Sequence, residues 1–97
     1  MATYLTLMQF TEQGIRNVKD TIKRAAAAKD EAAKIGVKFT DIFWMLGGHD
    51  LAILADAPDD ETITAYMLKL ASLGNVKTQT MRALRSNEME AILKKAG

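Results

Sequence analysis

The chain of 97 residues contains no cysteine. This absence excludes disulfide bonds, thiolate catalysis and metal sites built on cysteine. Histidine is represented only by His49, which also excludes a zinc site made from several histidines of one chain. We therefore expect no metal site and no bound cofactor.

Charge of one sign and long apolar runs are also missing. Thirteen Lys and Arg against twelve Asp and Glu give a formal net charge of +1, whereas nucleic-acid binding needs a concentrated basic face. No apolar run approaches the roughly 18 residues that span a bilayer, and the N-terminus lacks the basic stretch of a signal peptide. We therefore expect a cytoplasmic protein that binds neither nucleic acid nor a membrane.

Length and a hydrophobic content of 48% suit one small domain over residues 1–97. Residues 3–10 alternate and are rich in β-forming types, which predicts a strand. Apolar residues then recur at steps of three and four, which predicts a helix from residue 20 or 21 to residue 35. The inward stripe of this helix would be Ile22, Ala25, Ala28, Ala32 and Ile35.

This stripe is mainly alanine, so the helix is expected to lie close to the surface that it covers. Basic residues gather at its beginning and could receive an anionic ligand. We interpret them as an ordinary charged exterior, because no aromatic residues interleave for base stacking. These residues are Arg16, Lys19, Lys23 and Arg24.

Residues 39–58 carry the clearest pattern of the chain. Two apolar runs, residues 39–46 and 51–57, flank the link Gly47-Gly48-His49-Asp50. A short glycine-containing link between such runs predicts a β-hairpin. Alternation along the first run would place Phe39, Asp41 and Phe43 on one face.

The second half of the chain continues the alternation of helices and strands. A helix is expected from Asp59 or Asp60 to residue 73, then a strand over residues 76–84. A terminal helix capped by Ser86 would point Met89, Ile92 and Leu93 inward. The order β-α-β-β-α-β predicts a ferredoxin-like α+β fold, with a four-stranded antiparallel sheet and both helices on one face.

Helices on one face leave the other face of the sheet to be covered. Residues 42–46 are apolar on both sides, and exposed apolar sheet faces usually mark an interface. We therefore expect a homodimer with its sheets face to face, a dimeric α+β barrel. The alternative is a monomer in which the terminal helix, about ten residues long, covers part of this face.

Three segments resemble the GYD domain family in order and spacing, namely the hairpin, residues 11–20 and residues 72–76. The Gly-Tyr-Asp triplet that names the family stands here as Gly48-His49-Asp50. The resemblance covers nearly the whole chain and implies a ferredoxin-like fold, a shape related to dimeric α+β barrels and no established activity. Histidine in place of tyrosine removes a phenol hydroxyl and introduces a titratable ring.

His49 and Asp50 are the candidates for catalysis. An imidazole titrates near neutral pH, and a neighbouring carboxylate can orient it as a general base. The alternative is that Asp50 accepts hydrogen bonds from amides of the turn while the His49 ring packs at the hairpin tip, the commoner role for such residues.

Tyr4, Asp41 and Trp44 are the candidates for ligand binding. Ligand pockets are mostly apolar with few polar groups, so these residues could line a cleft between sheet and helices or the inside of a dimer barrel. The alternative is that the rings belong to the core and that Asp41 is a solvated end of a strand.

Three functions follow from these residues. The first is a homo-oligomeric module that binds or senses a small molecule. The second is a cofactor-independent enzyme, by analogy with oxygenases and isomerases of similar architecture, and the third is a structural subunit. A shared fold does not assign chemistry, so the sequence favours binding without naming the ligand.

Overall fold

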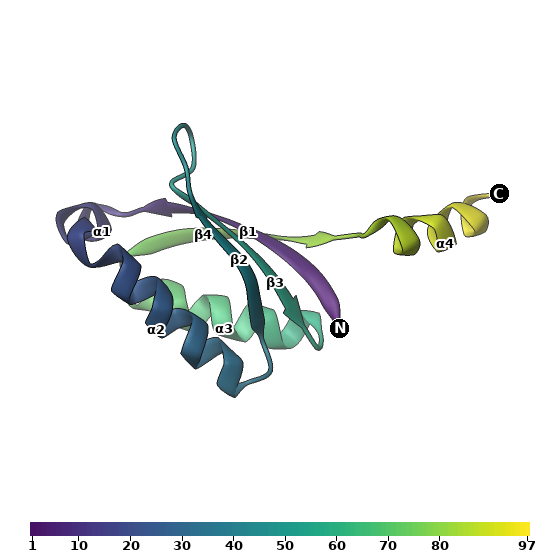
Figure 1. Ribbon diagram of the computed structural model, residues 1–97, viewed down its shortest axis with the longest axis horizontal. Helices are drawn as coiled ribbons and strands as arrows, with labels where there is room; N and C mark the ends of the chain where they lie inside the picture. Colours follow the sequence, from purple (N-terminus) through teal and green to yellow (C-terminus); the bar gives the residue numbers. More distant parts are fainter.

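A four-stranded antiparallel sheet with helices on one face forms the body of the computed structural model, which describes residues 1–97 (Figure 1). The strands lie in the order β2-β3-β1-β4, and this confirms the ferredoxin-like α+β prediction. No helix is both long and apolar enough to cross a membrane. The elements are β1 (Ala2–Phe10), α1 (Glu12–Arg16), a 3-10 turn η1 (Val18–Asp20), α2 (Thr21–Lys34), β2 (Lys38–Trp44), β3 (Leu51–Ala57), α3 (Asp60–Ser72), β4 (Val76–Ala83) and α4 (Ser86–Ala96).

Local signals in the sequence set the ends of the helices. The Thr11 hydroxyl accepts a hydrogen bond from the Gly14 N–H (3.1 Å), and the Asp59 carboxylate accepts one from the Thr62 N–H (2.7 Å), so both residues act as N-caps. Gly36 and Gly74 follow α2 and α3 with φ of +84° and +87°. Only glycine enters this left-handed region without strain, which ends both helices there.

The core lies between the helices and one face of the sheet. Aromatic rings from β2 and α3 meet there, with Phe39 and Tyr66 edge to face at a centroid distance of 5.9 Å. The Tyr66 hydroxyl donates to the Ala28 carbonyl oxygen at 2.7 Å and so ties α3 to α2. The other core residues are Tyr4, Met8, Ala32, Val37, Leu51, Ile53, Ala55, Ala57, Ile63 and Met67.

A β-bulge in β2 overturns one prediction about the hairpin. Phe39 pairs with Ala55 and Asp41 with Leu54, so Thr40 is an extra residue that breaks the alternation. Phe39 faces the helices and is buried, whereas Asp41 and Phe43 lie on the opposite face. The prediction that Phe39, Asp41 and Phe43 share a face is therefore wrong.

Helix α2 buries less of its predicted stripe than expected. Ala28 and Ala32 are buried, but Ile22 is 71% exposed. At 3.6 residues per turn, Ile22 lies about 100° around the helix axis from the midpoint of these two alanines. Ile35 follows the last helical residue and is also exposed.

Helix α4 projects beyond the end of the sheet, away from the other helices (Figure 1). None of its residues is buried, so the prediction that Met89, Ile92 and Leu93 point inward is wrong within this chain. An ion pair of 2.8 Å between Arg82 and Glu88 joins the start of the helix to β4. The monomer alternative requires α4 to cover the second face of the sheet, and in this position α4 does not cover it.

Candidate functional site

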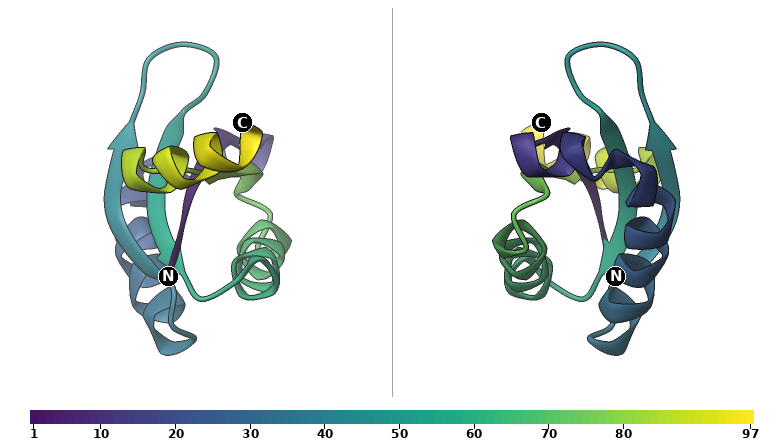
Figure 2. Two further views of the ribbon diagram at one scale, coloured as in Figure 1. Left: turned by 90° about the vertical axis from the view of Figure 1, so that its right-hand side faces the viewer. Right: turned by 90° about the vertical axis from the view of Figure 1, so that its left-hand side faces the viewer.

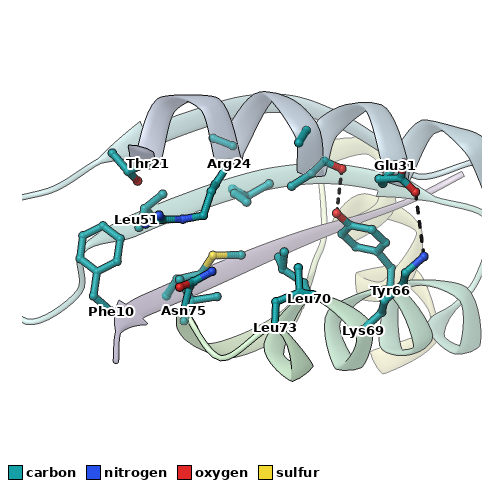
Figure 3. Close-up of a pocket in the computed structure, with 16 residues that line it drawn as sticks. Phe10, Thr21, Arg24, Glu31, Leu51, Tyr66, Lys69, Leu70, Leu73 and Asn75 are labelled. Atoms are coloured by element: carbon teal, nitrogen blue, oxygen red, sulfur yellow. Dashed lines mark hydrogen bonds and ion pairs between the residues drawn. The ribbon is translucent and has the colours of Figure 1, made fainter. Parts of the chain in front are cut away.

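A cavity of about 190 Å³ lies between α2, α3 and the helix-facing side of the sheet (Figure 3). Its lining is mostly apolar, with Met8, Leu51 and Ile53 from the strands and Leu70 from α3. The face of α2 that lines it carries only methyl side chains near the middle of the helix, including Ala28. Small side chains leave volume unfilled between two helices, so the alanine stripe makes this space.

Arg24 is the polar side chain that distinguishes one end of this cavity. Its Nη1 donates to the Asn17 carbonyl oxygen at 2.7 Å. Its Nη2 is buried and has no hydrogen-bond partner. Figure 3 shows the Arg24 side chain extending from α2 towards Leu51, with Asn75 on the other side of the cavity.

The opposite end of the cavity holds charges that are already paired. Glu31 lies 2.9 Å from Lys34 and 3.9 Å from Lys69, and the Lys34 ammonium lowers the pKa of the Glu31 carboxyl below its ordinary value. Tyr66 lines the same end, and burial raises the pKa of its phenol to about 12. The ring of Tyr66 therefore stays neutral at physiological pH.

Tyr4 lies outside this cavity. Its hydroxyl donates to the Asp60 carboxylate, and this hydrogen bond is the main cause that raises the pKa of Tyr4 above its ordinary value. The Arg82 guanidinium lies 5.7 Å from the centre of its ring, a cation–π contact. Tyr4 is thus a buried ring whose polar end is bound at the start of α3.

Trp44 and Asp41 lie apart from Tyr4 and from each other. The Trp44 Nε1–H donates to the Thr21 hydroxyl at 3.0 Å, on the helix side of the sheet. Asp41 is exposed on the opposite face. The structure therefore does not bring Tyr4, Asp41 and Trp44 together around one space within a chain.

Asp50 binds backbone rather than the ring of His49. Its carboxylate accepts a hydrogen bond from the Phe10 N–H at 2.8 Å, and its own N–H donates to the Met8 carbonyl oxygen at 2.8 Å. The Met45 N–H in turn donates to the Asp50 carbonyl oxygen at 2.8 Å. These hydrogen bonds are structural, as in the alternative that the sequence offered, but the carboxylate binds an amide of β1 rather than one of the turn. Neither Asp50 nor His49 lines the cavity.

Changing His49 and Asp50 separately distinguishes these roles. We expect His49→Tyr to alter the free energy of unfolding by less than about 0.5 kcal/mol, because no hydrogen bond of the ring is lost. Asp50→Ala is expected to lower it by about 1–3 kcal/mol, because the part-buried Phe10 N–H loses its acceptor. Urea unfolding followed by circular dichroism measures both values, and a larger loss for His49→Tyr would contradict this assignment.

Arg24 lines the cavity, although the sequence favoured a charged exterior for it over contact with an anionic ligand. The sequence placed it with Lys23 on a charged exterior, and the alanine stripe was expected to bring α2 close to the sheet. In the structure Arg24 lines a cavity that the same alanines leave open. The signal lay in one basic residue next to the run Ala25 to Ala28, but sequence alone does not show which way that residue points.

Two apolar surfaces are uncovered outside the cavity. The first, here called the open-face patch, lies on the side of the sheet away from α2 and α3, where Phe43 is 58% and Met81 38% exposed. The second is the hairpin loop between β2 and β3, which stands out from the body with Leu46 fully exposed (Figure 2). The open-face patch consists of Leu5, Leu7, Phe43, Leu54 and Met81.

Comparisons with known proteins agree with the fold and with the resemblance seen in the sequence. The model of the GYD domain family matches residues 4–93. A Thermus thermophilus protein called "Glutamine synthetase and cystathionine beta-lyase binding protein" is 30% identical over 95 residues, which cover 97% of this chain and 100% of that protein. The crystal structure of TTHA0845, also from Thermus thermophilus, matches with a TM-score of 0.58 over 89% of this chain and 96% of that one. At 22% identity this likeness concerns the fold alone.

Proposed function

The chain belongs to the GYD domain family, and from this premise we propose that it is a homo-oligomeric binding protein whose partners include enzymes. The observation that carries the proposal is the open-face patch. Helices cover the other side of the sheet, while on this side Phe43 and Met81 are exposed and Leu5 and Leu54 are only half-buried. A contiguous apolar surface of this kind is typical of an interface.

A second copy of the chain is the occupant that we propose for the open-face patch. Two sheets can pack face to face about 10 Å apart, which buries the apolar side chains of both copies. Helix α4 supports this arrangement, because Met89, Ile92 and Leu93 have no core of their own chain to join. A partner copy would supply the surface that this projecting helix lacks.

An enzyme is the further partner that we propose, and the similar protein from Thermus thermophilus supports it by its name. The hairpin loop is the surface best placed to reach such a partner. Leu46 is fully exposed at a loop that rises from the body, and Met45 beside it is 37% exposed. A projecting apolar side chain can fill a pocket on a partner and lose its contact with water there.

Binding can be tested with immobilised glutamine synthetase and cystathionine β-lyase from the organism that supplies this chain. We expect the wild-type chain to bind at least one of them in biolayer interferometry. Leu46→Ser should raise the Kd by about tenfold or more, as expected for loss of an apolar anchor. Leu68→Ser is the matched control, because Leu68 is 67% exposed on α3, and it should leave the Kd unchanged.

Failure of the wild type to bind either enzyme would contradict the proposed enzyme partners. Equal losses of affinity in Leu46→Ser and Leu68→Ser would instead show that the hairpin loop is not the docking surface. Both variants should keep the molecular mass of the wild-type assembly, because neither residue belongs to the open-face patch.

A second candidate role is small-molecule binding, which the sequence also predicts. The observation that favours it is the cavity between α2 and α3, with its apolar lining and its single unpaired cation. The alternative of a cofactor-independent enzyme has less support, because neither His49 nor Asp50 lines this cavity. Small-molecule binding needs no reacting groups beyond those that hold the ligand.

A further inference from the structure

Arg24 places an unpaired charge against the apolar cavity between α2 and α3. Its Nη2 is buried without a partner, while its Nη1 is satisfied by the Asn17 carbonyl oxygen. No acidic side chain pairs with it, since the ion pairs of this chain join Lys34 and Lys69 to Glu31 and Arg82 to Glu88. A buried donor without an acceptor is unfavourable, so a shift of the flexible Arg24 side chain that brings Nη2 to an acceptor on a ligand in the cavity would be favoured.

We propose that this cavity binds a small carboxylate with a compact apolar body, and that the carboxylate group binds Arg24. This proposal rests on the small-molecule role suggested above and names the class of ligand. A guanidinium is planar and presents paired N–H donors that match the two oxygens of a carboxylate. The apolar side chains of Leu51, Ile53 and Leu70 suit the rest of the ligand.

The volume of the cavity limits the size of this ligand. Drug-sized molecules occupy pockets of roughly 300 Å³ or more, and this cavity holds about 190 Å³. An apolar cavity of about 150 Å³ is large enough to bind benzene. The part of the ligand that enters the cavity is therefore a short aliphatic chain or a single ring.

The charges along α2 also set the orientation of the ligand. Glu31 lines the cavity seven residues after Arg24, which is about 10 Å along the helix axis. Glu31 is already paired with Lys34 and Lys69, whereas Arg24 has no acidic partner, so the acid group of the ligand lies at Arg24 and its apolar body points towards Tyr66. Thr21 and Asn75 line the cavity as well and offer neutral donors near the acid group (Figure 3).

An NMR titration of the full chain with hexanoate and with hexanol tests this inference. The two probes share an apolar tail and differ in charge. We expect hexanoate to shift amide signals around the cavity and to bind more tightly than hexanol. Arg24→Gln should weaken hexanoate binding by about tenfold or more and leave hexanol within about threefold, since the charge-assisted hydrogen bond is lost.

Two variants control for general effects of charge and for binding outside the cavity. Lys23→Gln removes one positive charge from the same turn at an exposed position outside the cavity lining, and it should leave hexanoate binding unchanged. Ala25→Leu fills the cavity from α2 and should abolish the binding of both probes while the spectrum stays that of a folded protein.

Three outcomes distinguish the proposal of a carboxylate ligand from the small-molecule role on which it rests. If hexanol binds as tightly as hexanoate and Arg24→Gln has no effect, the proposal of a carboxylate ligand is overturned but a small-molecule site remains. If neither probe binds the wild type, both the carboxylate proposal and the small-molecule role are overturned. An equal loss in Lys23→Gln and Arg24→Gln would assign the effect to general charge and overturn the role of Arg24.

Discussion

Replacing Phe43 by lysine is expected to convert the assembly into monomers without unfolding the chain. Phe43 is 58% exposed in the isolated chain, so a lysine at this position stays in water and disturbs no packing. In a face-to-face pair of sheets the same lysine would be taken out of water into the apolar interface, with Asp41 as the one acidic side chain of β2 on the same face. Desolvation of a buried charge costs several kcal/mol even beside a carboxylate, and a net cost of about 3 kcal/mol weakens association by about 100-fold.

Light scattering coupled to size-exclusion chromatography measures this change directly. The matched control is Ile22→Lys, which introduces the same charge at an isoleucine that is 71% exposed on α2, outside the open-face patch. We expect this control to keep the wild-type mass. An unchanged mass for Phe43→Lys, or equal dissociation in both variants, would show that the open-face patch does not hold the copies together.

Replacing Gly14 by alanine is expected to lower the free energy of unfolding by about 2–4 kcal/mol. A Cβ atom at this position would lie 2.0 Å from the Asn75 carbonyl oxygen, which is backbone and has little freedom to move. The same oxygen accepts a hydrogen bond from the Thr11 N–H at 3.1 Å, and the Thr11 hydroxyl donates to the Gly74 carbonyl oxygen at 2.5 Å. The clash would thus separate α1 from the turn between α3 and β4.

The direction of the change in stability distinguishes the close contact from helix propensity. Alanine favours an isolated helix over glycine by about 1 kcal/mol, so helix propensity alone predicts stabilisation. Gly48→Ala is the matched control, because a Cβ there meets nothing within 4 Å and its φ is not positive. In urea unfolding, Gly48→Ala should have a free energy of unfolding close to that of the wild type. A wild-type value for Gly14→Ala would contradict the close contact between Gly14 and Asn75.

The elements of this fold could be predicted because their signals are local. Asp59 and Thr11 cap helices through side chains only three residues from the amides that they bind, and Gly36 stops α2 where the left-handed backbone favours glycine. The hairpin followed in the same way from two apolar runs and a short glycine link. Such patterns need no knowledge of the rest of the chain.

The features that differ from prediction depend on tertiary contacts. The extra residue at Thr40 leaves no mark in the alternation of apolar side chains, so the change of face after Phe39 was invisible. The pattern of α4 indicates that Ile92 and Leu93 need cover, but it does not say that another chain must provide it. Likewise, whether Arg24 lines a cavity depends on how far α2 and α3 stand apart.

The molecular mass of the unmodified chain in solution tests the central claim of a homo-oligomer most directly. One chain has a mass of 10.7 kDa. We predict that light scattering at micromolar concentration gives at least twice this value, because the open-face patch and α4 expose apolar side chains in the isolated chain. A measured mass of 10.7 kDa at that concentration would contradict the proposed assembly.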